Sequence, residues 1–165
     1  MDDLVKEIDG VRCDDDAEHV HRMRVASRRL RAGVKTFADC FPRKLADGWR
    51  RSIRRITRDL GEARDLDVQI DLVRQTLESV SDKNFRPGLE RLLLRLGQRR
   101  AETQHEVVRT IDRLVSGRVL VDMAEALRRA RLQARLHAGD GDQTGLRRRA
   151  AEAIRLNLEE LMAYD

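Results

Sequence analysis

The chain has 165 residues, of which 38% are charged and 3% aromatic, and only two are proline. This length suits one domain with a sizeable core, and no apolar run approaches the length of a membrane-spanning helix. The formal net charge is +5, but residues 20–64 hold 14 Arg or Lys against 4 Asp or Glu, a local +10, so the remainder must sum to −5. Such confined positive charge indicates a polyanionic partner, and nucleic acid, polyphosphate, nucleotides and anionic lipid all stay open.

The N-terminal residues carry no targeting signal that we can identify. The stretch MDDLVKEIDG is acidic and lacks the apolar region of a signal peptide. The two cysteines, Cys13 and Cys40, have no metal-ligand spacing. These features favour a reduced, cytoplasmic protein without a membrane partner.

The first predicted helix covers Val20–Phe37 and should end near Cys40, after a start at which Asp15 and Glu18 have the spacing of a capping box. At about 100° per residue, one arc of roughly 80° collects cations and potential cations. These are His21, Arg24, Arg28, Arg31 and Lys35. A second arc, centred roughly 130° away, is apolar and can enter a core. Its members are Met23, Leu30, Val34 and Phe37.

Like charges at i,i+4 destabilise a helix, so the cationic row contributes nothing to folding but suits a polyanion that lies along it. The other interpretation is an ordinary solvated helix face, in a chain that contains 30 Arg and only 4 Lys. The pattern alone leaves both interpretations open.

The second predicted helix begins at Pro42, which suits the first turn of a helix, and ends at Gly61. One side of it is an apolar stripe, formed by Leu45, Trp49, Ile53, Ile56 and Leu60. The opposite side is basic, with Arg51, Arg54, Arg55 and Arg58. A third helix is expected from Asp65, which can cap it, and its seam is Leu66, Ile70, Val73, Leu77 and Val80.

Between these two helices, Arg64, Asp65 and Asp67 are interpreted as an ion-paired structural junction. A metal site is the weaker alternative, because two Asp at i,i+2 lack further carboxylates. No other motif calls for a metal or a cofactor. The segment at Asp140 and Asp142 resembles the start of a calcium loop, but Ala151 stands where a bidentate Glu is required, so a polar linker is expected.

The rest of the chain predicts three more helices and no strand. A long helix spans about 87–116, with a seam formed by Leu89, Leu92, Leu93, Leu96, Val107, Ile111 and Leu114, and Gly117 ends it. A fifth helix carries Leu120, Met123, Ala124 and Leu127, and a sixth carries Leu146, Ala150, Ile154, Leu158 and Leu161. The predicted class is all-α, a bundle of about six helices built from antiparallel hairpins. We expect one domain over residues 1–165, with a first bundle at about 15–116 and the start of a second at about 118–165.

Two motifs carry a resemblance to a known family. The stretch VHRMRVASRRLR at Val20–Arg31 and the stretch LGEARDLDV at Leu60–Val68 are together similar to the CHAD family, the conserved histidine α-helical domain. The resemblance implies a polyphosphate-binding module with no catalysis of its own. The family motif carries over onto the row from His21 to Lys35, and the family's basic positions in the second helix match Arg54 and Arg58 best. Arg51 and Arg55 are added from the periodicity alone.

The sequence also departs from the family pattern. The family usually continues into a second bundle with another His-x-x-Arg motif, whereas this chain ends at Asp165, about where that motif would begin. We therefore expect a short or C-terminally truncated member with an incomplete second bundle. Its sixth helix would lack partners for its apolar stripe, and two arrangements would cover that stripe: a homodimer, or a monomer in which the long fourth helix folds the sixth back onto the first bundle.

Other functions remain in competition with polyphosphate binding. The runner-up is a nucleic-acid-binding helical protein, although the five aromatic residues, most of which occupy apparent core positions, argue against base stacking. An enzyme acting on triphosphates has no support, because the chain lacks a glycine-rich phosphate loop and a nucleophile–base pair. A purely structural helical scaffold is the third alternative. If polyphosphate is the ligand, polyphosphate granules in the cytoplasm are the expected location.

Overall fold

The computed structural model describes residues 2–14, 16–82 and 84–137 of the chain. The helices are α1 (Asp2–Lys6), α2 (Ile8–Cys13), α3 (Ala17–Thr36), the short 3-10 helix η1 (Ala38–Cys40), α4 (Arg43–Ser79), α5 (Arg86–Ser116) and α6 (Val119–His137). No strand occurs in these ranges, which confirms the predicted all-α class. The predicted sixth helix and the linker before it lie outside the described residues.

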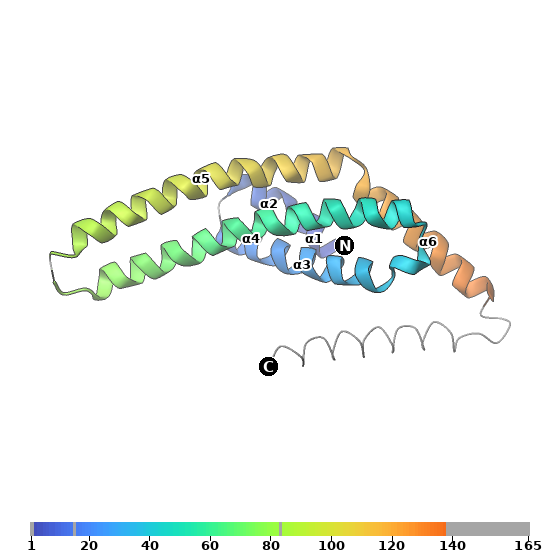
Figure 1. Cartoon of the computed structure of the whole chain (residues 1–165), viewed down its shortest axis with the longest axis horizontal. Helices are drawn as coiled ribbons and strands as arrows, with labels where there is room; N and C mark the ends of the chain where they lie inside the picture. Colours follow the sequence, from blue (N-terminus) through green and yellow to red (C-terminus); the bar gives the residue numbers. More distant parts are fainter. Residues whose placement is uncertain (1, 15, 83, 138–165) are drawn as a thin grey trace.

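The two longest helices, α4 and α5, form an antiparallel hairpin along which the other helices pack (Figure 1). Helix α3 runs antiparallel to the first part of α4, and α1 and α2 fold back onto α3. Helix α6 crosses the end of the hairpin where α4 begins and α5 ends. The far halves of α4 and α5 extend beyond α3 as a two-helix arm (Figure 1).

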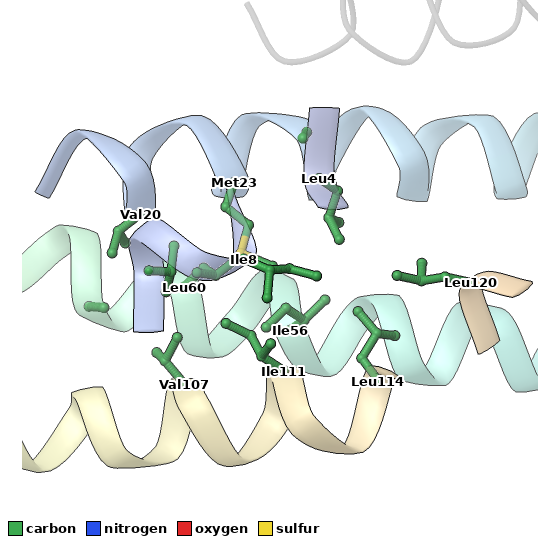
Figure 2. Packing of buried hydrophobic residues seen from close by; sticks show 13 residues of the cluster. Leu4, Ile8, Val20, Met23, Ile56, Leu60, Val107, Ile111, Leu114 and Leu120 are labelled. Carbon is green, nitrogen blue, oxygen red and sulfur yellow. The ribbon is translucent and has the colours of Figure 1, made fainter. Parts of the chain in front are cut away.

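The main core gathers apolar side chains from all the α-helices, as Figure 2 shows around Leu60 and Ile111. The acidic N-terminus, for which the sequence predicted no element, forms two short helices that contribute Leu4, Ile8 and Val11 to this core. Leu4 and Val11 are fully buried. At about 25 cal/mol per Å² of buried apolar area, three such side chains stabilise the fold substantially, so the N-terminal segment is part of the domain.

Helix α3 matches the predicted first helix. The side chain of Asp16 accepts a hydrogen bond from the backbone N–H of Glu18, with an O–N distance of 2.8 Å, while the predicted cap residue Asp15 lies outside the described residues. Met23 and Val34 are buried as predicted, whereas Phe37 follows the helix and keeps 42% of its surface exposed. The apolar stripe of α3 therefore ends one turn earlier than the sequence pattern predicted.

The predicted break between the second and third helices is wrong. Helix α4 runs without interruption through Gly61 and Asp65, so the two predicted helices are one helix of 37 residues. The physical reason is packing: Leu60, Ala63 and Leu66 are buried on both sides of the glycine, on the same face of a continuous helix. A glycine in a helix interior costs only about 1 kcal/mol, which this burial outweighs.

The break at Gly117 is confirmed, because α5 ends there. Its N–H donates to the backbone oxygen of Arg113 over 3.0 Å, and a Cβ at this position would lie only 2.7 Å from that oxygen. A residue other than glycine would therefore clash with the helix end. Some predicted seam positions are wrong: Leu45, Leu92 and Leu127 are each more than 40% exposed.

Candidate functional site

Helices α3 and α4 enclose a depression of about 690 Å³ whose walls are mostly cationic. From α3 it is lined by Arg28, Arg31, Ala32 and Lys35, and from α4 by Asp47, Arg50, Arg51 and Arg54. The structure thus brings together one part of each predicted basic row. Arg50 and Asp47 are lining residues that the sequence reasoning did not single out.

A small core beneath the depression fixes the spacing of the two helices. Val34 of α3 packs with Trp49 and Ile53 of α4 and with Met123 of α6. Trp49 is held in addition by Phe41, whose ring lies edge-on to it with 5.1 Å between the ring centroids. Because the apolar stripes of α3 and α4 face this core, their cationic flanks project side by side toward solvent.

Most of the cations in this depression have no charged partner. Among the described residues, Arg28, Arg31, Arg51 and Arg54 take part in no ion pair, although Arg50 lies 3.8 Å from Asp47. Charges this close repel each other, so the arrangement costs the folded chain free energy when no anion is bound. Guanidinium groups present several N–H donors in a rigid fork, which suits phosphate or carboxylate oxygens.

The other predicted cations of α3 lie elsewhere. Arg24 stretches along α4, and its Nε would lie 3.7 Å from a Cβ placed on Gly61. His21 lines a separate depression of about 360 Å³ whose walls include Glu7 and Glu18. The predicted row on α3 is therefore divided between two environments, and its His21 end faces carboxylates.

Arg55 and Arg58 turn to the opposite flank of α4. They line a depression of about 320 Å³ next to α5, in which Glu62, Glu102 and Glu106 are also present. Arg58 donates from its Nε to a carboxylate oxygen of Asp59 over 3.0 Å. These two arginines therefore do not share the depression between α3 and α4.

Asp59 is a buried carboxylate that joins α4 to α5. It is 8% exposed, and its second oxygen accepts a hydrogen bond from the Thr110 hydroxyl over 2.7 Å. Each oxygen of Asp59 thus has a donor, since Arg58 serves the first. This arrangement indicates a structural role for the pairing of Arg58 with Asp59.

The predicted junction at Arg64, Asp65 and Asp67 is wrong as a junction, because all three lie inside α4 and no helix starts there. Among the described residues, Arg64 and Asp65 form no ion pair. Asp67 instead reaches α5, where it accepts a hydrogen bond from Arg100 Nε over 2.6 Å. The pattern singled out a structurally important carboxylate but named no partner for it.

Arg100 is the centre of a buried polar network that the sequence reasoning missed. It is 8% exposed and donates to Asp67, to the Gln104 side chain and to Asp14, which follows α2 in a left-handed conformation with φ of 53°. Gln104 in turn donates to the backbone oxygen of Val11. The network ties the end of α2 to both long helices. One oxygen of Asp67 is buried without a hydrogen-bond partner.

A second buried carboxylate, Glu7, holds the N-terminal helices on α3. Its Oε2 accepts hydrogen bonds from His19 Nδ1 over 2.8 Å and from Arg22 Nε over 3.0 Å. Burial raises the pKa of Glu7, but the hydrogen bonds and positive charge of His19 and Arg22 outweigh it and hold the pKa below its ordinary value of 4.5. The imidazole of His19 lies directly over Gly10, where a Cβ would overlap the ring.

The described residues also bear on metal and membrane binding. In the described part of the chain, no group of three or more His, Cys, Asp or Glu side chains could hold a metal ion. Cys13 and Cys40 are exposed and free. None of the helices described is both long and apolar enough to cross a bilayer.

Comparison with known proteins gives one kind of match. The family model of the CHAD domain matches residues 1–164. No curated protein and no solved structure matches the chain.

Proposed function

The chain belongs to the CHAD family, and from that premise we propose that it binds inorganic polyphosphate in the depression between α3 and α4, without catalysis of its own. The observation that carries the proposal is the set of cations in this depression that form no ion pair with any residue the structure describes. These are Arg28, Arg31, Arg51 and Arg54.

The chemistry of the ligand matches the chemistry of the depression. A phosphate chain presents repeated negative charge and acceptor oxygens, and it has no base edges to be read. Arginines from two helices can bind successive phosphates through forked, charge-assisted hydrogen bonds. Bound phosphate would also relieve the repulsion among the arginines, so the free energy that the empty site costs is regained on binding.

The motif positions outside the depression have a different part in the proposal. Arg24 of α3 would extend the cationic surface toward Gly61 of α4. His21 and Arg58, which lie near carboxylates, would add to the positive potential without contacting a chain bound in the depression. Arg55 lies on the far flank of α4, where it lines another depression.

Nucleic acid is the alternative ligand, and the aromatic side chains bear on it. Trp49 is 5% exposed, but Phe37, which was predicted to lie in the apolar stripe of the first helix, is 42% exposed, and Phe85 is 64% exposed. Neither exposed ring lines the depression between α3 and α4. A single-stranded nucleic acid bound there would lack the stacking platform that such proteins use.

A competition assay at fixed ionic strength tests the proposal. Fluorescently labelled long-chain polyphosphate is bound to the protein and displaced with unlabelled polyphosphate, single-stranded DNA or duplex DNA. We expect polyphosphate to compete at much lower phosphate concentration than either DNA. Equal or better competition by DNA would replace the proposal with the nucleic-acid alternative.

The proposed ligand also predicts where the protein is located. A chain that binds polyphosphate would be recovered with polyphosphate granules, which a pull-down on isolated granules would measure.

The predicted dimer rested on the apolar stripe of the sixth helix. That helix lies outside the described residues, so the structure adds no argument for the dimer.

A further inference from the structure

We propose that the polyanion path does not end in the α3–α4 depression but crosses α4 at Gly48 and enters a second anion subsite on the opposite flank. The subsite is a depression of about 390 Å³, and its α4 wall includes Lys44, Gly48, Arg51, Ser52 and Arg55. This inference rests on the proposed function, because it concerns the route of the same ligand.

Arg51 connects the two depressions. It lines the α3–α4 depression and also the second one, so it is shared between them. At about 100° per residue, Lys44, Arg51 and Arg55 fall within an arc of roughly 40° on the outward side of the helix. A phosphate chain bound to Arg51 from one flank can therefore reach these neighbours on the other.

Gly48 leaves a gap on this outward side of α4. It lies on the same side at spacings of four and three from Lys44 and Arg51, and it is the member of this set that has no side chain. A Cβ at Gly48 would meet nothing within 4 Å, as would one at Gly33, Gly88 or Gly97, so no neighbouring side chain requires glycine here. What distinguishes Gly48 is its place among the cations of the second depression, where a missing side chain leaves room for a ligand to cross the helix.

The charges of the subsite suit a phosphate chain that is already anchored. Lys44, Arg51 and Arg55 are exposed and form no ion pair within the described ranges, and Ser52 adds a hydroxyl donor. Asp122 of α6 opposes them, so the net positive charge is smaller than in the α3–α4 depression. A weaker second subsite gains from the high effective concentration of a chain that is held in the first.

The path also has a limit. Beyond Arg55, the next depression is lined by four arginines and four carboxylates, so its formal charges cancel. These are Arg55, Arg58, Arg99 and Arg113, and Asp59, Glu62, Glu102 and Glu106. A surface without net positive charge attracts phosphate less than the two cationic depressions, so it favours no further phosphates. The inferred route therefore runs from the α3–α4 depression, over Gly48, to Lys44 and Arg55.

Chain length separates the two sites experimentally. Tripolyphosphate is short enough to occupy one depression and should choose the more cationic one, whereas long-chain polyphosphate spans both. We expect Lys44→Ala to weaken long-chain binding roughly tenfold, as for loss of one charge-assisted contact, and to leave tripolyphosphate binding within about twofold. Arg91→Ala, which removes one exposed cation from the arm, should change neither and controls for net charge.

Gly48 gives a test that changes no charge. Gly48→Gln should close the gap and weaken long-chain binding, whereas Gly33→Gln, at another helix position with open space around it, should not. Both substitutions should raise the melting temperature, because each replaces a glycine inside a helix. The raised melting temperature then shows that each variant is folded.

The outcomes are distinct. If the unaltered protein binds neither tripolyphosphate nor long chains, the proposed function fails, and the second subsite fails with it. If it binds both, but Lys44→Ala and Gly48→Gln leave long-chain affinity unchanged or weaken both ligands equally, the route over α4 is wrong and the α3–α4 site stands alone.

Discussion

Arg99 and Arg100 are neighbours in α5, yet their guanidinium groups are in opposite environments. Arg99 donates to Glu62 over 3.0 Å on the surface, where the two side chains are 63% and 50% exposed. The side chains of Arg100 and Asp67, taken without their backbone, are 10% and 9% exposed and are joined by a hydrogen bond of 2.6 Å. Surface ion pairs contribute little, whereas breaking a buried one leaves an uncompensated charge.

Arg100→Ala should therefore destabilise the fold by about 3–5 kcal/mol, because Asp67 would remain buried without its partner. Arg99→Ala is the matched control and should cost less than about 1 kcal/mol. Urea denaturation followed by circular dichroism measures both. Equal, small losses for the two variants would mean that water reaches Asp67 in solution and that the network is not a structural centre.

A second pair of substitutions separates binding from folding on α3. Arg28 is exposed in the α3–α4 depression, whereas Leu30 packs against both core clusters. Arg28→Ala should weaken polyphosphate binding and keep or raise the melting temperature, because repulsion is removed. Leu30→Ala should lower stability by about 2–5 kcal/mol. Comparable unfolding by the two variants would assign the arginine to the fold.

The pKa of Glu7 predicts how stability depends on acidity. Because the folded-state pKa is held below 4.5, the contribution of Glu7 is fully present above about pH 5 and is lost as the pH falls through the folded pKa. Glu7→Gln should lower stability at pH 7 and flatten the loss of stability below pH 5. Thermal melts of both proteins from pH 7 to pH 3 provide the measurement, and parallel curves would contradict the assignment.

The sequence predicted the exposed cations better than the buried pairs. Arg28 and Arg31 could be placed from helical periodicity, which is a local property. Asp67 and Arg100 are 33 residues apart, and nothing local relates them, because their pairing depends on the register between α4 and α5. The same holds for Glu7 and His19, since no periodicity showed that the N-terminal helices fold back onto α3.

At the scale of the helix, Gly61 shows where local signals fail. Glycine after an apolar stripe is a common helix end, and Asp65 is a plausible cap for a new helix. The buried face nevertheless continues in phase from Ile56 to Ile70, and a continuous helix buries all of it against α3 and α5. At Gly117, by contrast, local sterics and the helix end agree.

Gly61→Ala distinguishes the two interpretations of that glycine. A Cβ there would make an ordinary contact, at 3.7 Å from Arg24 Nε, so alanine should stabilise α4 by about 1 kcal/mol. Gly117→Ala should instead destabilise the protein by about 1–3 kcal/mol, because its Cβ would clash with a backbone oxygen. Chemical denaturation measures both changes, and a destabilised Gly61→Ala protein would indicate a helix end at that position.

Over the whole molecule, the antiparallel arrangement of α3 and α4 decides which cations meet. The sequence predicted that both helices are basic on one side, and the structure shows Arg31 and Arg54 in one depression. The sequence did not predict that Arg55 would turn to the other flank of α4. Which residues of α4 belong to which flank depends on where α5 and α6 pack against it. The net charge of +5 therefore understates the local field that an anion meets.

Salt dependence reports how many phosphates the molecule contacts. By analogy with nucleic acids, each contact contributes roughly 0.7–0.9 to the slope of log affinity against log salt concentration. Four to six cations in the α3–α4 depression then contribute roughly −3 to −5 to the slope for long-chain polyphosphate, and contacts in the second depression would make it steeper. Titrations at several sodium chloride concentrations should show that Arg54→Ala makes the slope shallower by roughly one contact, while Arg91→Ala leaves it unchanged. A slope near zero for the unaltered protein would mean that binding does not use this cationic surface.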